Sequence, residues 1–180
     1  MTRLAGHGVT LRGFRDDELD RLVEVTEAWP QGDGVHWGRR SRDELRQKIE
    51  ASGRWTDAVM IDFAIEENGR LVGEIQARQP RHGLPRGVFE LGVEVYEGAD
   101  RGRGVGGRAV AELTDHLFRE ERAHRVQLST DVDNAAMRRV AERAGFVFEG
   151  VLRGFMPTAE GPRDYAMYAI TRADHDDRNR

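Results

Sequence analysis

One glycine- and arginine-rich segment of the chain reads Arg101-Gly102-Arg103-Gly104-Val105-Gly106-Gly107-Arg108-Ala109. Before it, residues 88–96 alternate apolar and polar side chains, which predicts a half-buried strand. After it, apolar residues recur every four positions over about 104–121, which predicts an amphipathic helix. Glycines let backbone N–H groups approach a ligand closely, and the N-terminus of a helix attracts negative charge. The sequence therefore predicts an α/β sheet with a phosphate-binding turn after this strand.

Two nucleotide-binding templates fit this segment incompletely. Gly102 and Gly107 have the spacing of a P-loop, but the positions that should carry a lysine and a hydroxyl are Arg108 and Ala109. The same glycines, with Gly104 between them, match the dinucleotide pattern G-x-G-x-x-G, although a loop separates the first glycine from the end of the strand. An NAD-dependent oxidoreductase is therefore kept as a minor alternative.

Two further blocks follow in the second half of the chain. The first runs from Asp133 to Phe146 (DNAAMRRVAERAGF), and the second reads Glu149-Gly150-Val151-Leu152-Arg153. Together with the R-x-x-G-x-G pattern that begins at Arg101, they resemble the GNAT acetyltransferases. They are most similar to the branch that contains the ribosomal-protein N-terminal acetyltransferases. The resemblance covers about residues 9–172 and implies a soluble acetyltransferase.

The resemblance implies a mixed, mostly antiparallel twisted sheet of about six or seven strands, splayed at its centre and flanked by about four helices. It implies acetyl-CoA as the cosubstrate, with the pyrophosphate on the backbone of residues 103–108 and the pantetheine arm paired with main-chain groups near Val93 and Val95. Asn134 would hydrogen-bond the arm, although an asparagine before a helix also serves as an N-cap. The implied cofactor-binding residues are Val93, Val95, Arg101, Gly102, Arg103, Gly104, Val105, Gly106, Gly107, Arg108, Asn134 and, toward the adenosine phosphates, Arg139.

The implied reaction is transfer of an acetyl group to a primary amine by direct attack on the thioester. An acceptor amine is protonated near neutral pH, so a base must first remove a proton. Glu90 and Glu94 lie on one face of the strand before the glycine segment and are the candidate bases. Either carboxylate could instead be an ordinary solvent-facing residue of a half-exposed strand.

A proton donor for the departing thiolate is harder to identify. The family often has a serine three residues after the asparagine or a tyrosine seven residues after it, where this chain has Met137 and Ala141. Tyr165 is the leading candidate donor, with Tyr96 and Tyr168 as alternatives, unless the thiolate departs into water. A non-catalytic acetyl-CoA-binding module is therefore the second hypothesis.

The acceptor pocket is predicted beside two helices, one over about 16–29 and one that begins with a Ser41–Glu44 capping box and ends near residue 52. The loops 29–38 and 79–87 would contribute to it, with Trp29, Trp37 and Trp55 as possible lining residues. The acceptor is expected to be a small-molecule amine or a protein N-terminus. A homodimer is possible by resemblance.

Composition sets outer limits on these hypotheses. The 180 residues suit one domain over 1–172, and the polar segment 173–180 is expected to be a disordered tail. With no cysteine, disulfides and thiolate zinc sites are excluded, and the histidines show no metal-ligand spacing. The net charge of −4 argues against a general nucleic-acid footprint. The absence of a long apolar run argues for a cytoplasmic protein without a membrane span.

Overall fold

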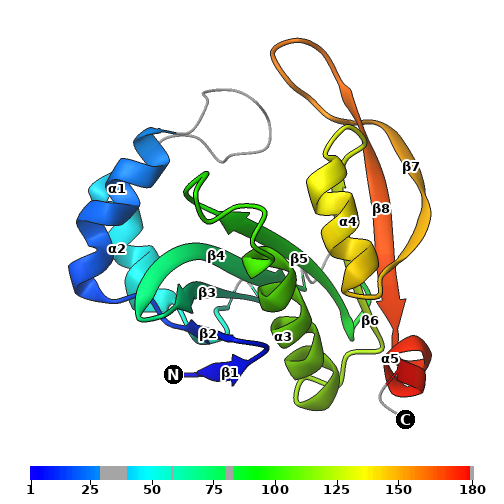
Figure 1. The fold of residues 1–180 in the computed structure, drawn as a ribbon, viewed down its shortest axis with the longest axis horizontal. Helices are drawn as coiled ribbons and strands as arrows, with labels where there is room; N and C mark the ends of the chain where they lie inside the picture. Colours follow the sequence, from blue (N-terminus) through cyan, green and yellow to red (C-terminus); the bar gives the residue numbers. More distant parts are fainter. Residues whose placement is uncertain (29–39, 58, 80–82, 179–180) are drawn as a thin grey trace.

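A computed structural model describes residues 1–28, 40–57, 59–79 and 83–178. These residues form one sheet of eight strands in the order β1-β2-β3-β4-β5-β6-β8-β7 (Figure 1). Neighbouring strands are antiparallel except for β5 and β6, which are parallel. The strands are β1 Leu4–Gly6, β2 Val9–Arg12, β3 Met60–Glu67, β4 Arg70–Arg78, β5 Val88–Val95, β6 Arg125–Asp131, β7 Val147–Met156 and β8 Arg163–Thr171. The helices are α1 Leu19–Glu27, preceded by a short 3-10 turn at Asp16–Glu18, α2 Arg42–Ala51, α3 Val105–Arg119, α4 Ala135–Arg143 and α5 Arg172–Arg178.

The predicted mixed, mostly antiparallel sheet is therefore confirmed, with one strand more than expected. The Ser41–Glu44 capping box acts as predicted, and a second local signal forms the turn between β3 and β4. The Ser41 hydroxyl accepts from the Glu44 N–H at 3.3 Å, and the Glu44 carboxylate accepts from the Ser41 N–H at 2.7 Å, so α2 begins with a capping box. Asn68 and Gly69 both have positive φ, 51° and 77°, as the tight hairpin turn between β3 and β4 requires.

Helices cover the two faces of the sheet differently. α3 and α4 lie on one face (Figure 1), where α3 buries Val105, Ala109, Leu113 and Leu117 against the main core. On the opposite face, α1 and α2 pack Leu22, Leu45 and Ile49 around Phe14 and Ala64. Because side chains alternate along β3, Ala64 and Asp62 face α1 and α2 while Phe63 and Ile65 face the α3 side.

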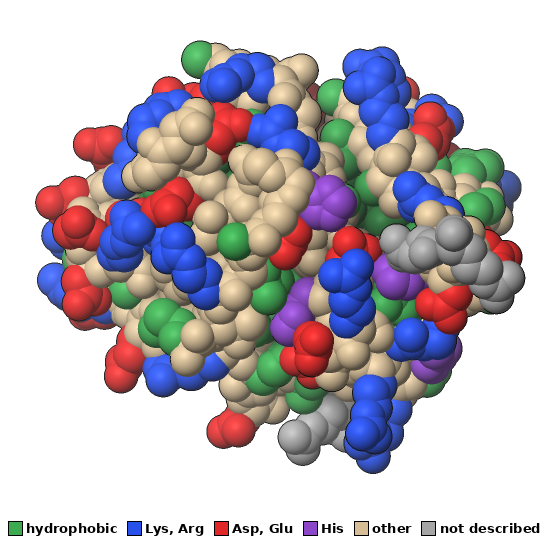
Figure 2. Space-filling view, turned by 60° about the horizontal axis from the view of Figure 1, so that its bottom comes forward, with side chains coloured by type: hydrophobic (Ala, Val, Ile, Leu, Met, Phe, Trp, Pro, Cys, Tyr) green, Lys and Arg blue, Asp and Glu red, His purple; other side chains and the backbone are tan. Residues whose placement is uncertain are grey.

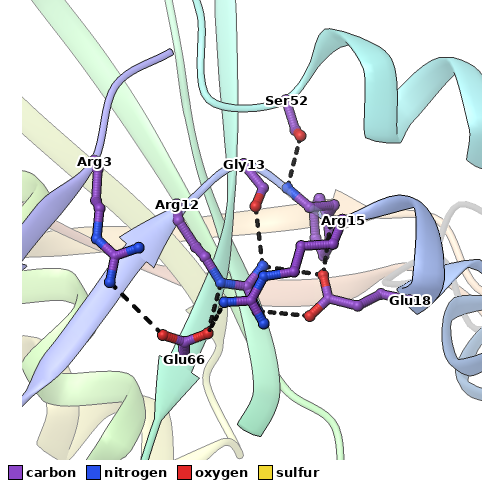
Figure 3. A network of polar contacts seen from close by, with 8 residues as sticks. Arg3, Arg12, Gly13, Arg15, Glu18, Ser52 and Glu66 are labelled. Atoms are coloured by element: carbon purple, nitrogen blue, oxygen red, sulfur yellow. Dashed lines mark hydrogen bonds and ion pairs between the residues drawn. The ribbon is translucent and has the colours of Figure 1, made fainter. Parts of the chain in front are cut away.

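An ion-pair network fixes the start of α1 to the sheet (Figure 3). Arg12 at the end of β2 is 5% exposed and donates from Nε to Glu66 at 2.8 Å and from Nη2 to Glu18 at 2.6 Å. Arg15 also donates to Glu66, at 2.6 Å, and the main-chain N–H of Phe14 donates to Ser52. The hydrogen bond from Arg12 is the main reason why the pKa of Glu66 lies below its ordinary value. These contacts hold in place the layer formed by α1 and α2 on one face of the sheet.

The segment 173–180, predicted to be a disordered tail, is helical in the structure over 173–178, as part of α5. Arg172 donates from Nη2 to the carbonyl oxygens of Phe118 and Ala123, at 2.7 and 2.6 Å. His175 is 8% exposed, stacks on the Phe118 ring at 4.6 Å and contacts Asp115 at 3.0 Å. The segment is polar in sequence, but it is held in place by residues near the end of α3, which lie more than fifty positions earlier in the chain.

Acidic and basic side chains are interspersed over the face drawn in Figure 2, and many of them are ion-paired. No described helix is long and apolar enough to cross a membrane. Neither observation identifies a partner or a site.

Candidate active site

The two parallel strands at the centre of the sheet separate after a short contact. β5 and β6 pair only from Val88 opposite Arg125 to Glu90 opposite Gln127. Beyond this point the rest of β5 and the rest of β6 diverge, as the resemblance implied. A cavity of about 500 Å³ lies in the resulting wedge, lined by both strands and by residues of β4, α4, β7 and β8. An extended ligand can therefore lie between the strands without breaking an existing ladder.

The main chain of β5 presents hydrogen-bonding groups to this wedge. The N–H of Tyr96 donates to the carbonyl oxygen of Val72 at 3.0 Å, toward β4. Alternate residues of a strand direct their main-chain groups to opposite neighbours, so those of Val93 and Val95 point toward the wedge. Val93 lines the cavity, whereas the Val95 carbonyl already accepts a hydrogen bond of 2.9 Å from Arg101 Nε.

The glycine segment turns into α3 with main-chain amides exposed at the helix start. Gly102 and Gly104 have φ of 75° and 81°, a conformation that other residues rarely adopt, and Gly104 is the N-cap. The Arg108 N–H donates to the Gly104 carbonyl at 3.0 Å, which is the first helical bond. No described protein group accepts from the three preceding N–H groups, 105–107. Within the segment 103–108, where the sequence predicts pyrophosphate binding, the N–H groups without an acceptor among the described residues are therefore those of 105–107.

The arginines of this segment are engaged with acidic side chains. Arg103 lies 3.0 Å from Asp100 and 3.3 Å from Glu67. Arg108 pairs with the same Glu67 carboxylate and donates to the Arg103 carbonyl at 3.1 Å. These contacts brace the glycine segment against the β3–β4 turn. The cationic charge that the sequence attributes to the loop is consequently offset by Asp100 and Glu67.

Helix α4 begins at the opposite side of the wedge. Asn134 Oδ1 accepts from the Met137 N–H at 3.0 Å, so this side chain is an N-cap, and both residues line the cavity. Arg139 lies exposed on α4. The neighbouring Arg138 instead turns inward and donates to the Tyr168 hydroxyl at 3.1 Å.

Three cross-strand pairs form a polar wall on the α1–α2 side of the cavity. They are Arg78–Glu90, Gln76–Gly92 and Glu74–Glu94, and all six residues line the cavity. Both oxygens of Glu90 are occupied, since Arg78 Nε donates to one at 3.1 Å and Gln127 Nε2 to the other at 3.2 Å. Glu94 lies farther from the β5–β6 contact, with Arg101 Nη2 at 4.0 Å. The two candidate bases thus share the cavity but differ in their surroundings.

A buried polar cluster next to this wall was missed in the sequence. Lys48 of α2 donates to Glu74 at 2.8 Å and lies 3.8 Å from Asp62, and the Tyr96 hydroxyl donates to Glu74 at 2.7 Å. Burial opposes ionisation of Glu74, but the charge and hydrogen bond of Lys48 outweigh it and hold the Glu74 pKa below its ordinary value. Burial raises the pKa of Asp62, and burial together with Glu74 raises the pKa of Tyr96. The signal in the sequence was the alternation of Glu74 with other polar residues along β4.

The structure separates the three candidate tyrosine donors. Tyr165 is 6% exposed and lines the cavity, with its ring 5.5 Å from that of Phe155. Tyr168 contacts Arg138 and Glu142 outside the cavity, and the hydroxyl of Tyr96 is given to Glu74.

Of the predicted acceptor-pocket residues, Trp29 and Trp37 lie outside the described residues, as do 80–82. Trp55 does not line the cavity. It packs against Phe89 at 5.6 Å and donates to Glu121 at 2.7 Å. The opposite wall of the cavity is instead formed by the largely apolar side chains of Leu128, Met137, Phe155, Met156 and Tyr165.

Known proteins resemble this chain in sequence and in fold. The family model described as Acetyltransferase (GNAT) domain matches residues 9–147. A mycothiol acetyltransferase of Propionibacterium freudenreichii subsp. shermanii is 32% identical over 156 residues, which are 83% of this chain. The chain spans only 46% of the length of that relative.

Two solved structures show the same fold at low identity. One, RimL, a ribosomal L7/L12 alpha-N-protein acetyltransferase in complex with coenzyme A, has a TM-score of 0.77 at 20% identity and covers 94% of this chain and 97% of its own. The other, a dodecameric spermidine N-acetyltransferase from Vibrio cholerae, has a TM-score of 0.76 at 18% identity and covers 97% of this chain and 100% of its own.

Proposed function

The chain belongs to the GNAT acetyltransferase family, and on that premise we propose that it is an acetyl-CoA-dependent N-acetyltransferase whose reaction takes place in the wedge between β5 and β6. The single observation that carries this proposal is that the N–H groups of 105–107, which have no acceptor among the described residues, lie beside the strand that lines the wedge, since a Cβ at Gly106 would stand 3.6 Å from the Val95 side chain and 3.9 Å from that of Val93. A nucleotide diphosphate can accept from these amides while its thiol-bearing arm lies between the strands.

The residues present fit acetyl-CoA, which would supply the activated acyl carbon. The N–H groups of 105–107 would hold the pyrophosphate, and main-chain groups of Val93 would pair with the pantetheine arm. The oxidoreductase alternative fits less well. β5 ends at Val95, so Gly102 stands several residues after the strand and not in the tight turn that a dinucleotide site needs.

Glu94 is the general base in this proposal. It lies on the polar wall and has a polar environment in which an amine proton can be accepted. Glu90 shares that wall at its narrow end, where Arg78 and Gln127 hold its two oxygens. Glu90 is therefore assigned to fixing the narrow end of the wedge.

Tyr165 is the proton donor for the departing thiolate. Its support is its position, since among the three tyrosines it is the one that lines the cavity. Met137 lines the same cavity and carries no exchangeable proton. A tyrosine hydroxyl delivered from β8 would compensate for this methionine.

The acceptor we propose is a primary amine with one positive charge and an apolar flank, of which a protein N-terminus is the leading example. The four acidic residues of the cavity are each accompanied by a cation: Glu74 by Lys48, Glu90 by Arg78, Glu94 by Arg101 at 4.0 Å, and Asp131 by Arg163 at 2.6 Å. Such a wall offers little net attraction to a polycation such as spermidine. The apolar wall around Phe155 can cover a side chain next to the amine.

Release of free CoA from acetyl-CoA, measured with two acceptors, tests this proposal. A peptide with a free amino terminus and an apolar first residue should be turned over, whereas the same peptide with a blocked terminus should not. Spermidine should be the poorer acceptor. Glu94→Gln should reduce kcat by about 100-fold or more, as expected for loss of a general base, without changing CoA affinity. CoA binding with no turnover on any amine would instead support the non-catalytic module.

A further inference from the structure

Lys48 is the only lysine among the 28 basic residues of the chain, and the proposed reaction assigns it no role. α2 turns Leu45, Lys48 and Ile49 toward the sheet, so the Lys48 side chain is only 7% exposed. Its Nζ lies 2.8 Å from a Glu74 oxygen and 5.4 Å from the centre of the Phe14 ring. A positive charge is therefore held beneath α2, in direct contact with a carboxylate of the polar wall.

Glu74 connects this charge to the proposed base. Glu74 and Glu94 are direct partners in the β4–β5 register, so their side chains leave the same face of the sheet. Cβ atoms of such pairs are about 4.5–5.5 Å apart. Two carboxylates at this separation make each other harder to ionise. Their side chains are only 20% and 21% exposed, which limits screening by solvent.

Other charged and titratable groups surround the pair: Asp62 on β3, Tyr96 after β5, Arg101 in the glycine segment, Arg40 before α2, and Glu18. Burial raises the pKa of Asp62 and that of Tyr96, and Lys48 opposes the rise at Asp62. Lys48 Nζ lies 2.8 Å from Glu74 and 3.8 Å from Asp62, so its charge acts most strongly on Glu74.

We propose that Lys48 is a positioning residue of the reaction: by compensating the negative charge of Glu74, it favours the ionised form of Glu94, which takes the acceptor proton. This inference rests on the proposed function, in which Glu94 is the base. Lys48 does not touch either substrate and acts through Glu74 alone.

The test is the titration midpoint of the Glu94 carboxyl, followed by NMR in the protein without substrates and assigned with Glu94→Gln. Lys48→Met leaves Glu74 and Glu94 without their cation, so the two carboxyls titrate as a coupled pair, and the upper midpoint of that pair should rise by about one pH unit. Glu74→Gln leaves the lysine charge in place and should lower the Glu94 midpoint. The double variant should return to within about 0.3 of the wild type, because the two changes cancel. Arg46→Met, which removes an exposed charge from the same helix, is the matched control and should not move it.

Unchanged midpoints in both Lys48→Met and Glu74→Gln would overturn the proposal, even if kcat or stability fell. Loss of a lysine with a purely structural role would lower kcat or stability without moving the Glu94 midpoint. Should Lys48→Met fail to fold, Glu74→Gln still tests the sign of the coupling. The acid limb of the pH dependence of kcat/KM separates the two levels of inference. If the midpoints shift as expected but the limb survives in Glu94→Gln, the assignment of the base fails, and the role of Lys48 in the reaction fails with it.

Discussion

Arg101 Nε donates a hydrogen bond of 2.9 Å to the carbonyl oxygen of Val95, so the first arginine of the glycine segment folds back onto the last residue of the strand before it. Its Nη2 also lies 3.4 Å from the Tyr96 carbonyl. The arginine that begins the family pattern thus links the strand to the glycine segment that follows it. In this arrangement the Arg101 guanidinium stabilises the conformation of the loop.

Replacing Arg101 should loosen the loop and weaken cofactor binding. Arg101→Gln removes a charged hydrogen bond worth about 1.5 kcal/mol, and we expect CoA affinity to fall by about tenfold. Calorimetric titration with CoA measures this directly. Arg119→Gln, at an exposed position on α3, is the control and should leave the affinity unchanged. Wild-type CoA affinity in Arg101→Gln would show that the Arg101–Val95 hydrogen bond is dispensable for CoA binding.

The left-handed conformation of Gly104 gives a second prediction. With φ of 81° at the N-cap of α3, Gly104→Ala should cost about 1–2 kcal/mol of unfolding free energy and misplace the amides at 105–107. Chemical denaturation and CoA titration should both detect it. Gly98→Ala is the matched control in the same loop, because its added Cβ meets no atom within 4 Å and Gly98 does not have positive φ. Equal behaviour of the two variants would contradict this account.

The Arg12–Glu66 pair predicts an acid-dependent stability. The folded-state pKa of Glu66 lies below its ordinary value of 4.5, chiefly because of the hydrogen bond from Arg12. A lowered pKa stabilises the fold above the unfolded value, and this contribution is lost as pH falls through the folded value. Glu66→Gln should therefore lose about 3 kcal/mol near neutrality, with Arg12 left partly uncompensated, and the loss should shrink below pH 4.5.

Urea denaturation of Glu66→Gln at several pH values measures that trend. Glu24→Gln, whose side chain is 68% exposed and pairs with Arg21, is the control and should change little at any pH. A stability difference that stays constant from neutral pH to below pH 4 would show that Glu66 contributes through packing rather than charge.

The parts of this fold that could be predicted are those encoded by neighbouring residues. The Ser41–Glu44 capping box, the Asn68–Gly69 turn and the Asn134 cap each depend on residues within one turn of chain, so the sequence shows them directly. The three-residue strand β1 is too short to carry a period, and it was missed.

The parts that could not be predicted depend on register and on distant partners. Glu74 meets Lys48 and Tyr96 only because α2 lies over β4 and β5, which no local pattern specifies. The loop arginines look available for phosphate in the sequence, but Glu67, 41 residues before Arg108, engages two of them. Helix α5 belongs to the same class, since its polar composition resembles that of a disordered tail.

Arg172 carries the last prediction, on the stability of α5. Its Nη2 donates to two main-chain carbonyls at the end of α3 and the following loop, and its guanidinium lies 5.4 Å from the centre of the Phe118 ring. Arg172→Met retains most of the apolar bulk but leaves both carbonyls without this donor, so we expect a loss of about 2 kcal/mol and a Tm lower by about 4–8 °C.

Hydrogen exchange should show the loss locally. In Arg172→Met the amides of α5 should exchange faster than in the wild type, whereas the amides of the central strands should not. Arg143→Met, at an exposed position near the end of α4, removes the same charge and should shift Tm by about 2 °C at most. CoA affinity should be unchanged in Arg172→Met, because α5 is absent from the cavity lining. Unaltered exchange in residues 172–178 would mean that the stack of His175 on Phe118 is sufficient to hold the helix.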